Sequence, residues 1–265
     1  MTPVVDVALS PANLHRAPTT VVIDALRATS TAVSALGGGY RRVRVVPDVA
    51  SALALRGPGR VLAGEHRYVT PPEFDHGNSP ADAAVRRGHE LVLATTNGTP
   101  AIVAAVQISE TVLLASMPNL AATVQAVRNR GGAVQLVCSG SEGEVALEDV
   151  YVAGRIVAEL TAPRTDAALL ADAIARRYRS PLEAFSASAA AGKLRAVGME
   201  DDIGDCARES VLDLVAEVAV GGRGCSVVSA QPASSPGSAR PVSTQTEPSP
   251  VAASPPADDR SLAPS

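Results

Sequence analysis

The stretch VVIDALRATSTAVSAL, residues 21–36, places an acid, an arginine and three hydroxyl side chains between an apolar run and an alanine-rich run. The β-branched residues 20–23 are typical of a buried strand, and the apolar spacing of residues 29–36 is typical of a helix. Asp24 and Arg27 therefore lie in a strand-to-helix turn. In open α/β sheets such turns collect ligands, because free backbone N–H groups and the helix dipole favour anions there.

The composition is that of a globular protein. The 265 residues are 46% hydrophobic and 19% charged, which is enough to bury a core in one large domain or two lobes. With a formal net charge of -4, the chain lacks the basic surface that nucleic-acid or anionic-membrane binding usually needs. No apolar run reaches the roughly 20 residues that cross a bilayer, and the N-terminus MTPVVDVALS has no signal-peptide features. We therefore predict a cytoplasmic protein without nucleic-acid or membrane partners, in which Cys138, Cys206 and Cys225 stay reduced.

Short β-branched apolar runs alternate with alanine-rich stretches of helical period, which predicts an α/β fold. We expect layers in the order α/β/α around a largely parallel or mixed sheet, with the active-site cleft at the C-terminal ends of its strands. The predicted strands are residues 20–23, 42–46, 60–63, 90–94, 111–114 and 133–137. The predicted helices are residues 29–36, 100–106, 120–130 and 147–159, and a short helix that begins at the capping box of Ser180 and Glu183.

The last part of the chain has a different composition. From Ser229 onward proline and serine dominate, so this segment buries too little apolar surface to offset the entropy of ordering. We predict a folded domain over residues 1–228 and a disordered tail over residues 229–265. The oligomeric state stays open, because alanine-rich helices and few aromatic residues suit either a homo-oligomer or a biased genome.

Three segments share one design, in which an apolar strand leads through a turn rich in hydroxyls, amides and glycines into a helix. They are IDALRATST (residues 23–31), LATTNGTPAI (93–102) and LVCSGSEGEVALED (136–149). Helix capping explains any one turn, but TTNGT, residues 95–99, offers more donors than one helix start uses. Arg27 favours an anion cradle, since its planar fork binds phosphate, sulfonate or carboxylate oxygens. The alternative is a structural ion pair between Arg27 and Asp24.

The polar loop GEHRYVTPPEFDHGNSP, residues 64–80, has the composition of an active-site lip. Glu65 immediately follows a predicted strand, so we expect it at the same sheet edge as Asp24. Carboxylates beside anion-binding turns suggest a bridging hard cation such as Mg2+, because the acids would otherwise repel the anion. Glu148 and Asp149, at the start of a helix, are further candidate ligands; alternatively, Glu148 only complements the helix dipole.

Several familiar phosphate chemistries are excluded by spacing. A cysteine phosphatase loop that begins at Cys138 needs an arginine where this chain has Glu144. An aspartyl phosphatase of the DxD type needs a second acid where this chain has Leu26. No Walker loop, nucleophile elbow or HExxH motif occurs. We therefore interpret Cys138 as a small buried side chain at a strand end.

Five motifs, in this order along the chain, resemble a known family. VIDALRATST, FDHGNSP, TTNGT, CSGSEGEVALEDVYVAG and GMEDDIGDCA are similar to motifs of the 2-phosphosulfolactate phosphatases of coenzyme M biosynthesis, and the resemblance covers residues 21–207. It implies a magnesium-dependent phosphohydrolase with an α/β fold, whose cleft accepts a small phosphorylated acid that also carries a sulfonate. The chain departs from the family pattern at Ala25, where a bulkier aliphatic is frequent, and at His66, Arg67 and Tyr68, where a glycine-rich continuation is frequent.

The resemblance also implies roles for individual residues. The implied catalytic residues are Asp24, Arg27, Thr29, Ser30 and Asn97. The implied substrate-binding residues are Asn78, Ser79, Thr95, Thr96, Gly98, Thr99, Ser139 and Gly140. The implied metal ligands are Asp24, Glu65 and Asp149, and Asp75 and Glu148 are further functional positions of the same motifs.

These assignments lead to a hypothesis of phosphomonoester hydrolysis, in which 2-phosphosulfolactate or a related ester is cleaved to phosphate. Mg2+ would polarise the phosphoryl group, while Arg27 and residues 95–99 neutralise the charge that develops on its oxygens. Asp24 is either a metal ligand or a nucleophile, since a metal-activated water would also serve. Two alternatives from other classes are a protein that binds an anionic metabolite without turnover and a phosphotransferase with an acceptor other than water.

Overall fold

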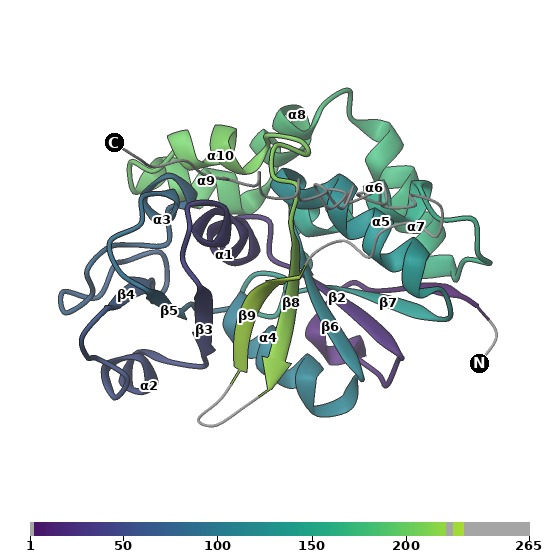
Figure 1. The fold of residues 1–265 in the computed structure, drawn as a ribbon. Coiled ribbons are helices and arrows are strands. Elements are labelled where there is room, and N and C mark those ends of the chain that lie inside the picture. The colour runs from purple at the N-terminus through teal and green to yellow at the C-terminus, as the bar shows by residue number, and fades with distance from the viewer. Residues whose placement is uncertain (1–2, 221–224, 231–265) are drawn as a thin grey trace, which may run out of the picture. The chain divides into compact units, whose positions relative to one another are not determined.

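The computed structural model describes residues 3–220 and 225–230, and these form an α/β fold around one nine-stranded sheet (Figure 1). The strands lie in the order β1-β7-β2-β6-β8-β9-β3-β5-β4. They are β1 (Val5–Ala8), β2 (Thr19–Ile23), β3 (Arg42–Val46), β4 (Arg60–Gly64), β5 (Glu90–Ala94), β6 (Thr111–Ala115), β7 (Val134–Cys138), β8 (Val215–Val220) and β9 (Cys225–Ala230). The predicted α/β class and the mixed sheet are therefore confirmed.

Strand β2 is buried along its whole length, and its last three residues, Val21, Val22 and Ile23, are apolar. Val21 and Ile23 pack into one apolar cluster and Val22 packs into another, because successive side chains of a strand point to opposite faces. A strand that is apolar on both faces is typical of a parallel sheet with helices on each side.

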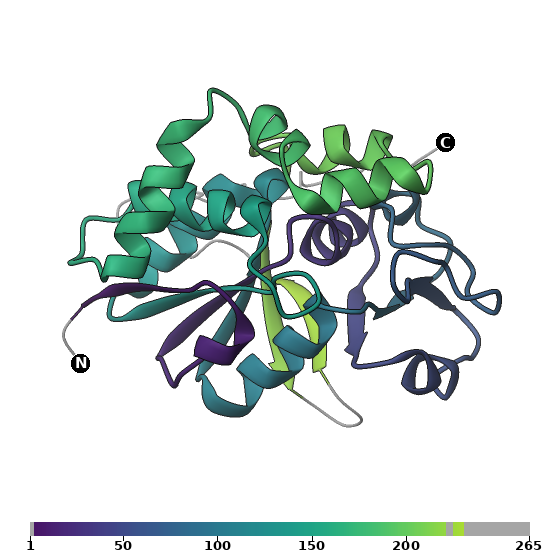
Figure 2. The same ribbon diagram turned by 180° about the vertical axis from the view of Figure 1, so that it is seen from behind.

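The helices cover the sheet from two sides. They are α1 (Ala28–Gly37), α2 (Val49–Leu53), α3 (Pro80–Ala84), α4 (Gly98–Ile108), α5 (Leu120–Arg130), α6 (Leu147–Ala158), α7 (Asp166–Arg177), α8 (Pro181–Ser186), α9 (Ala189–Ala196) and α10 (Asp201–Cys206), with 3-10 helices η1 (Pro11–Asn13) and η2 (Met117–Asn119). Helix α4 lies behind the sheet in Figure 1 and in front of it in Figure 2. Helices α5 to α10 pack with β1, β7, β2 and β6 in one apolar cluster, whereas α1 and α4 pack with β3 and β5 in another.

A hairpin divides the sheet into two parallel groups. β1, β7, β2 and β6 form one group, and β3, β5 and β4 form the other. β8 and β9 lie between the groups and pair antiparallel with each other, with β6 and with β3. These three antiparallel pairings mean that the two groups run in opposite directions.

This topology corrects one expectation about the site. Asp24 follows β2 and Glu65 follows β4, so the two acids do not share one edge of a parallel sheet as expected. The cause is the hairpin, which pairs Val227 of β9 with Val43 of β3 and reverses the strand direction. Asp24 and Glu65 nevertheless line the same pocket.

Every predicted strand and helix is present, with ends that differ from the prediction by at most two residues. Ser180 caps α8 as expected, because its hydroxyl accepts the Glu183 amide at 3.2 Å. The sequence analysis did not predict β1, β8, β9, α2, α3, α7, α9 or α10. The predicted domain boundary at residue 228 falls within β9, and the rest of the expected tail lies outside the described residues.

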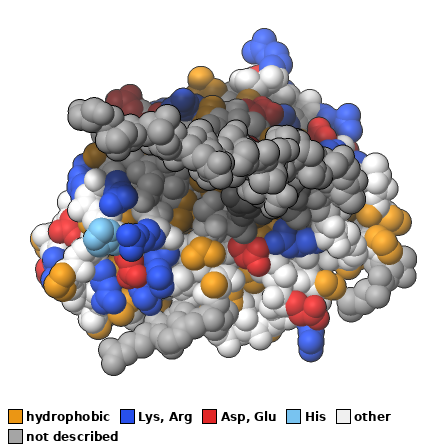
Figure 3. Space-filling view, viewed as in Figure 1, with side chains coloured by type: hydrophobic (Ala, Val, Ile, Leu, Met, Phe, Trp, Pro, Cys, Tyr) orange, Lys and Arg blue, Asp and Glu red, His pale blue; other side chains and the backbone are white. Residues whose placement is uncertain are grey.

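Charges of both signs are mixed on the described surface. Arg42, Arg44 and Arg60 each form an ion pair with Glu90. Figure 3 likewise shows basic and acidic side chains close to one another on the face in view. In the described part of the chain, no helix has the length and apolar character needed to cross a bilayer.

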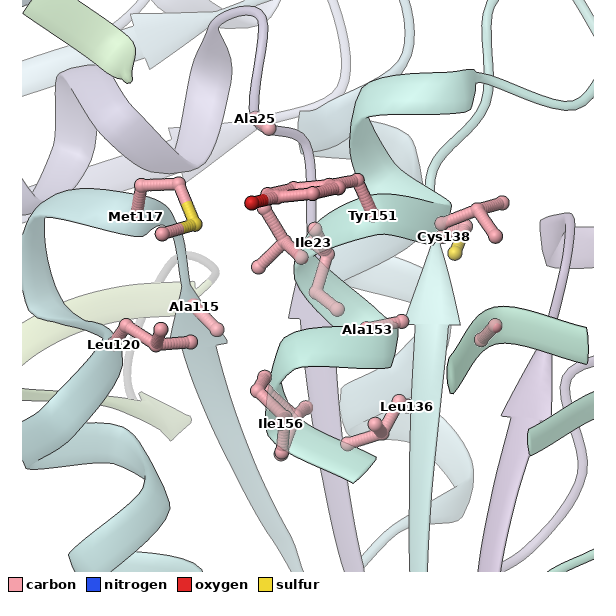
Figure 4. Packing of buried hydrophobic residues seen from close by; sticks show 14 of the residues in the cluster. Ile23, Ala25, Ala115, Met117, Leu120, Leu136, Cys138, Tyr151, Ala153 and Ile156 are labelled. Carbon is pink, nitrogen blue, oxygen red and sulfur yellow. The ribbon is translucent and has the colours of Figure 1, made fainter. Parts of the chain in front are cut away.

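Helix α6 is anchored on the first group of strands. Its residues Tyr151, Ala153 and Ile156 are buried against side chains of β2, β6 and β7 (Figure 4). The Tyr151 ring also meets Phe185 edge to face, with ring centres 6.2 Å apart. Such a pair adds about 0.5–1.5 kcal/mol beyond the burial of its area. This packing holds the first turn of α6 beside the ends of β2 and β7.

Candidate active site

Asp24 lies in the turn between β2 and α1 and is 7% exposed. Its Oδ1 accepts a hydrogen bond from the Ala28 amide at 3.0 Å. Burial raises the pKa of Asp24 to about 7, although the Ala28 hydrogen bond acts in the opposite direction. The charges of Glu65 and Glu148 raise this pKa further, whereas Arg27 lowers it. Asp24 is therefore a carboxylate whose negative charge a bound cation would stabilise.

The start of α4 meets the start of α1 at Asp24. A Cβ built on Gly98 would lie 2.6 Å from the Cβ of Ala28 and closer still to Oδ2 of Asp24. Only glycine allows this approach. Because both helix N-termini are directed at one point, their dipoles favour negative charge there.

Hydroxyls of the first two turns stabilise the turns themselves. Thr29 and Ser30 each donate to a backbone carbonyl of the first turn at 2.8 Å. Thr99 donates to the Thr95 carbonyl at 2.9 Å. These hydroxyl protons are used inside the protein, so the three hydroxyls stabilise the turns through bonds to backbone carbonyls. The N-cap residues of α1 and α4, Arg27 and Asn97, make no side-chain capping bond.

Glu65 connects the loop after β4 to the second turn. Its carboxylate accepts hydrogen bonds from the Thr96 amide at 2.8 Å and the Thr96 hydroxyl at 3.0 Å. It also accepts the Tyr68 amide at 2.6 Å. The Arg67 amide in turn donates to Oγ1 of Thr96 at 2.8 Å. The first part of the polar loop is thus fastened to the TTNGT turn.

Asp149 connects the first turn to the third. Its Oδ1 accepts the Ala25 amide at 2.8 Å, and its Oδ2 accepts the Gly140 amide at 3.0 Å. Burial raises the pKa of Asp149, and the charges of Asp24 and Glu148 add to this effect. Glu148 is 2% exposed, and its Oε2 is buried with no hydrogen-bond partner among the described residues. Asp149 therefore shapes two turns, whereas Glu148 keeps an oxygen for a ligand.

Arg27 pairs with Asp202 of α10 instead of Asp24. Its Nη1 contacts Oδ2 of Asp202, and both side chains are buried. The Ser79 hydroxyl donates to the other carboxylate oxygen of Asp202 at 2.7 Å. The Nε and Nη2 groups of Arg27 have no hydrogen-bond partner in the described part of the chain. The ion pair with Asp24, considered from the sequence, is replaced by one with Asp202.

Asp202 is a residue of this network that we did not predict from the sequence. It belongs to the motif GMEDDIGDCA, so the resemblance marked the segment. The motif holds several acids, however, and only the fold shows that Asp202 is the one that reaches Arg27.

A pocket opens between the turns. The predicted site residues that line it are Asp24, Arg27, Glu65, Asn78, Thr96 and Asn97. Its lining also includes Arg67 and Tyr68, two departures from the family pattern that we expected to border the substrate, and Leu26 and Glu142, for which we predicted no role. The other predicted site residues, Thr29, Ser30, Ser79, Thr95, Gly98, Thr99, Ser139, Gly140 and Asp149, do not line it.

Some polar groups at the site remain free. Oδ1 of Asn78 and Oγ of Ser139 are buried, and no described residue bonds to them. A buried polar atom without a partner costs about 1–3 kcal/mol, so these atoms indicate a ligand or water. Oδ1 of Asn97 accepts the Glu142 amide at 3.0 Å. Asp75, in contrast, accepts the Leu62 amide at 2.7 Å and does not line the pocket.

The predicted metal ligands do not form a compact group of three carboxylates. Among residues 3–220 and 225–230, no three His, Cys, Asp or Glu side chains are grouped to hold a metal ion by themselves. Glu65 and Asp149 both bind backbone amides through their two oxygens. The metal assignment to Asp24, Glu65 and Asp149 stays a prediction.

The cysteines are buried. Cys138 and Cys206 have no exposed surface, and burial raises the pKa of each thiol. A thiol with a raised pKa is a poor nucleophile. Cys138 at the end of β7 is therefore a small core side chain, as we interpreted it from the sequence.

Comparison with known proteins finds relatives over most of the chain. A sequence model of the family described as 2-phosphosulpholactate phosphatase matches residues 6–221. A probable 2-phosphosulfolactate phosphatase of Thermus thermophilus is 41% identical over 195 residues, which are 71% of this chain and 82% of the relative. One of Pseudothermotoga lettingae is 35% identical over 213 residues, which are 80% of this chain and 94% of the relative. A 2-phosphosulfolactate phosphatase of Methanothermobacter thermautotrophicus is 32% identical over 192 residues, 72% of this chain and 82% of the relative.

Proposed function

The chain belongs to the 2-phosphosulfolactate phosphatase family, and on this premise we propose that it hydrolyses 2-phosphosulfolactate to sulfolactate and inorganic phosphate. The family is one of phosphoric monoester hydrolases. The observation that carries the proposal is a single pocket in which Asp24 and Arg27 of the first turn meet Thr96 and Asn97 of the second. Such a pocket combines an acidic side for a metal with a donor side for phosphoryl oxygens.

Arg27 is the main candidate for binding the phosphoryl oxygens. Its Nη1 is held by Asp202, which leaves Nε and Nη2 free of partners among the described residues. A guanidinium binds two phosphate oxygens at once, which orients the group for in-line displacement. Asn97 and the helix N-termini at Asp24 would add donors and favourable dipoles. Catalysis would then depend on charge stabilisation at the equatorial oxygens.

The acidic side of the pocket fits Mg2+. Asp24, Glu65 and Glu148 lie near enough that two of these charges raise the pKa of the third. Glu148 also keeps a buried oxygen without a described partner. Carboxylates that repel each other at a site for an anion suit a hard divalent cation. We propose that Asp24 and Glu65, which line the pocket, hold Mg2+ together with oxygens of water and substrate, because Mg2+ needs only one or two carboxylates. Asp149 acts through the turns that it joins.

Bound Mg2+ would supply Lewis-acid polarisation of the phosphoryl group. Within the protein, Arg27 would orient the phosphoryl oxygens, and Asp202 would orient Arg27. Asp24 serves as a metal ligand in this proposal, and the Ala28 amide, which donates to its Oδ1, fixes the orientation of its carboxylate.

Phosphate release by the purified protein tests the proposal. The panel comprises 2-phosphosulfolactate, phospholactate and phosphoglycerates, each with Mg2+ or EDTA, and Asp24→Asn serves as the inactive control. We expect release that needs Mg2+ and is lost in Asp24→Asn. Folded protein that releases no phosphate from any ester would contradict hydrolysis. Thermal stabilisation by an ester without turnover would instead indicate a metabolite-binding protein, and ester loss that needs an acceptor would indicate a phosphotransferase.

The cellular role forms part of the proposal. We place the reaction in coenzyme M biosynthesis and in the cytoplasm. Cells that lack the protein should then accumulate 2-phosphosulfolactate, and fractionation should recover the activity with cytoplasmic markers. A homo-oligomer remains a prediction, which light scattering on the purified protein would test.

A further inference from the structure

We propose that Arg67 binds the second acid group of the substrate, a sulfonate or carboxylate that accompanies the phosphate. The inference rests on the proposed function and deepens it. Two arginines line the pocket, Arg27 and Arg67. Asp202 neutralises Arg27. The Arg67 guanidinium has neither an ion pair nor a hydrogen bond with any described residue, since only its backbone amide is bonded.

Glu142, the acid of the pocket lining whose pKa Arg67 affects, already pairs with another cation. Glu142 also lines the pocket, and its Oε2 lies 2.8 Å from Nζ of Lys193. The hydrogen bond from Lys193 is the main reason that the pKa of Glu142 is lowered, and Arg67 contributes least. The positive charge of Arg67 is therefore left for a ligand.

The backbone holds Arg67 at the pocket. Arg67 and Tyr68 have φ angles of 52° and 68°, a backbone conformation that residues other than glycine rarely adopt. The Arg67 amide donates to Oγ1 of Thr96, and the Tyr68 amide donates to Glu65. Thr96 and Glu65 are themselves pocket residues. The Arg67 side chain thus starts from the wall of the same pocket that would hold the phosphate.

The charges of the substrate require such a cation. By its chemical formula, 2-phosphosulfolactate carries a carboxylate and a sulfonate on the carbons next to the phosphorylated position. The pocket also contains Asp24, Glu65 and Glu142, which would repel a second anion. A guanidinium matches two oxygens of a sulfonate or carboxylate. Arg44 differs from Arg67 in this respect, because its Nε lies 2.9 Å from Glu90.

Substrates that lack one acid group at a time test the proposal. The set is 2-phosphosulfolactate, phospholactate without the sulfonate, the phosphate ester of isethionate without the carboxylate, and ethyl phosphate without either. Arg67→Gln should lower kcat/KM for 2-phosphosulfolactate at least about tenfold, mainly through KM, and leave ethyl phosphate unchanged. The truncated ester that becomes insensitive to the substitution identifies the acid group bound by Arg67. The kcat/KM of Arg67→Lys for 2-phosphosulfolactate should fall between those of wild type and Arg67→Gln, because lysine keeps the charge but lacks the planar guanidinium.

A matched control and a binding experiment separate this inference from the proposed function. Arg16→Gln removes an exposed arginine that precedes β2, at the opposite end of that strand from Asp24, and it should change no kinetic constant. Calorimetry with sulfolactate and with inorganic phosphate should show that Arg67→Gln weakens only sulfolactate binding. Failure of wild-type protein to release phosphate would contradict the hydrolase, and calorimetry would still decide the role of Arg67. Unchanged sulfolactate affinity in Arg67→Gln, or an equal loss of activity on all four esters, would overturn the inference.

Discussion

Gly98 of α4 packs directly against the carboxylate of Asp24. A Cβ at residue 98 would lie 2.6 Å from the Cβ of Ala28 and even nearer to Oδ2 of Asp24. The contact joins turns that follow β2 and β5, two strands of opposite direction. The position of the Asp24 carboxylate therefore depends on the absence of a side chain at residue 98.

Gly98→Ala should lower kcat/KM at least about 100-fold, because displacement of a positioned group by about 1 Å has an effect of this order. Steady-state phosphate release at saturating Mg2+ measures the loss. Gly192→Ala is the matched control, since Gly192 lies in α9 and a Cβ there would meet no atom within 4 Å. The control should keep full activity and gain up to about 1 kcal/mol of stability. Wild-type activity in Gly98→Ala would show that the close contact is unnecessary.

Asp24→Asn should make the metal-free protein more stable than wild type near pH 8. Burial raises the pKa of Asp24 to about 7, so between about pH 4 and pH 7 the folded state holds a proton that the unfolded state has lost. The free energy of unfolding of wild type therefore falls as pH rises through this window, and asparagine removes that dependence.

Thermal unfolding in EDTA, at about pH 5 and about pH 8, compares the stability of wild type with that of Asp24→Asn. Added Mg2+ should then stabilise wild type at the higher pH and leave Asp24→Asn nearly unchanged, because a ligand stabilises only the state that binds it. If the difference in stability between wild type and Asp24→Asn does not change with pH, the pKa of Asp24 is not raised.

Asp202→Ala should destabilise the protein by about 3 kcal/mol, because removal of one partner leaves the buried Arg27 charge without compensation. It should also lower kcat, since Arg27 loses the contact that orients it. Denaturant unfolding and phosphate release give the two values. Asp201→Ala changes the adjacent, exposed acid of α10 and should stay within about 0.5 kcal/mol of wild type. Equal effects of the two substitutions would remove Asp202 from the site.

Asp149→Asn separates a metal ligand from a positioning residue. Asparagine has one acceptor oxygen, so it cannot accept both the Ala25 and the Gly140 amides, and its NH2 group would face a donor. We expect kcat to fall at saturating Mg2+ while the Mg2+ concentration for half-maximal rate stays unchanged. Glu65→Gln should instead raise that concentration. A raised Mg2+ requirement in Asp149→Asn would make Asp149 a ligand.

Alkylation tests whether a thiol takes part in the reaction. Cys138 and Cys206 are fully buried with raised pKa values, so iodoacetamide should leave the native protein active. Cys138→Ala should likewise keep kcat and lose only stability. Inactivation that substrate prevents would contradict this expectation.

The elements that the sequence predicted are all present with nearly the predicted ends, because the signals for them are local. The predicted strand over residues 90–94, of which residues 91–94 are aliphatic, matches β5 residue for residue. The hairpin was missed for a physical reason. β8 and β9 border the Pro/Ser-rich segment and gain their partners from β6 and β3, which lie far away along the chain. Nothing in their own residues predicts a place at the centre of the sheet.

The site could be predicted in part for the same reason. Polar residues at strand ends indicated Asp24, Arg27 and Glu65, which line one pocket. The roles of the individual residues could not be predicted from residue types. Thr29 has the hydroxyl that an anion site wants, yet its proton goes to a backbone carbonyl. Asp202 looks like any acid of its helix until α10 is placed against Arg27.

The central hairpin also has a consequence for synthesis on the ribosome. Both parallel groups precede residue 215, so they are translated before β8 and β9 exist. Until then β6 and β3 present unpaired backbone edges, which are sites of aggregation in nascent chains. The pairing of Val43 with Val227 spans most of the folded chain, and such distant contacts slow folding. A chain released before Ala230 would therefore need a chaperone at the two edges in the middle of its sheet.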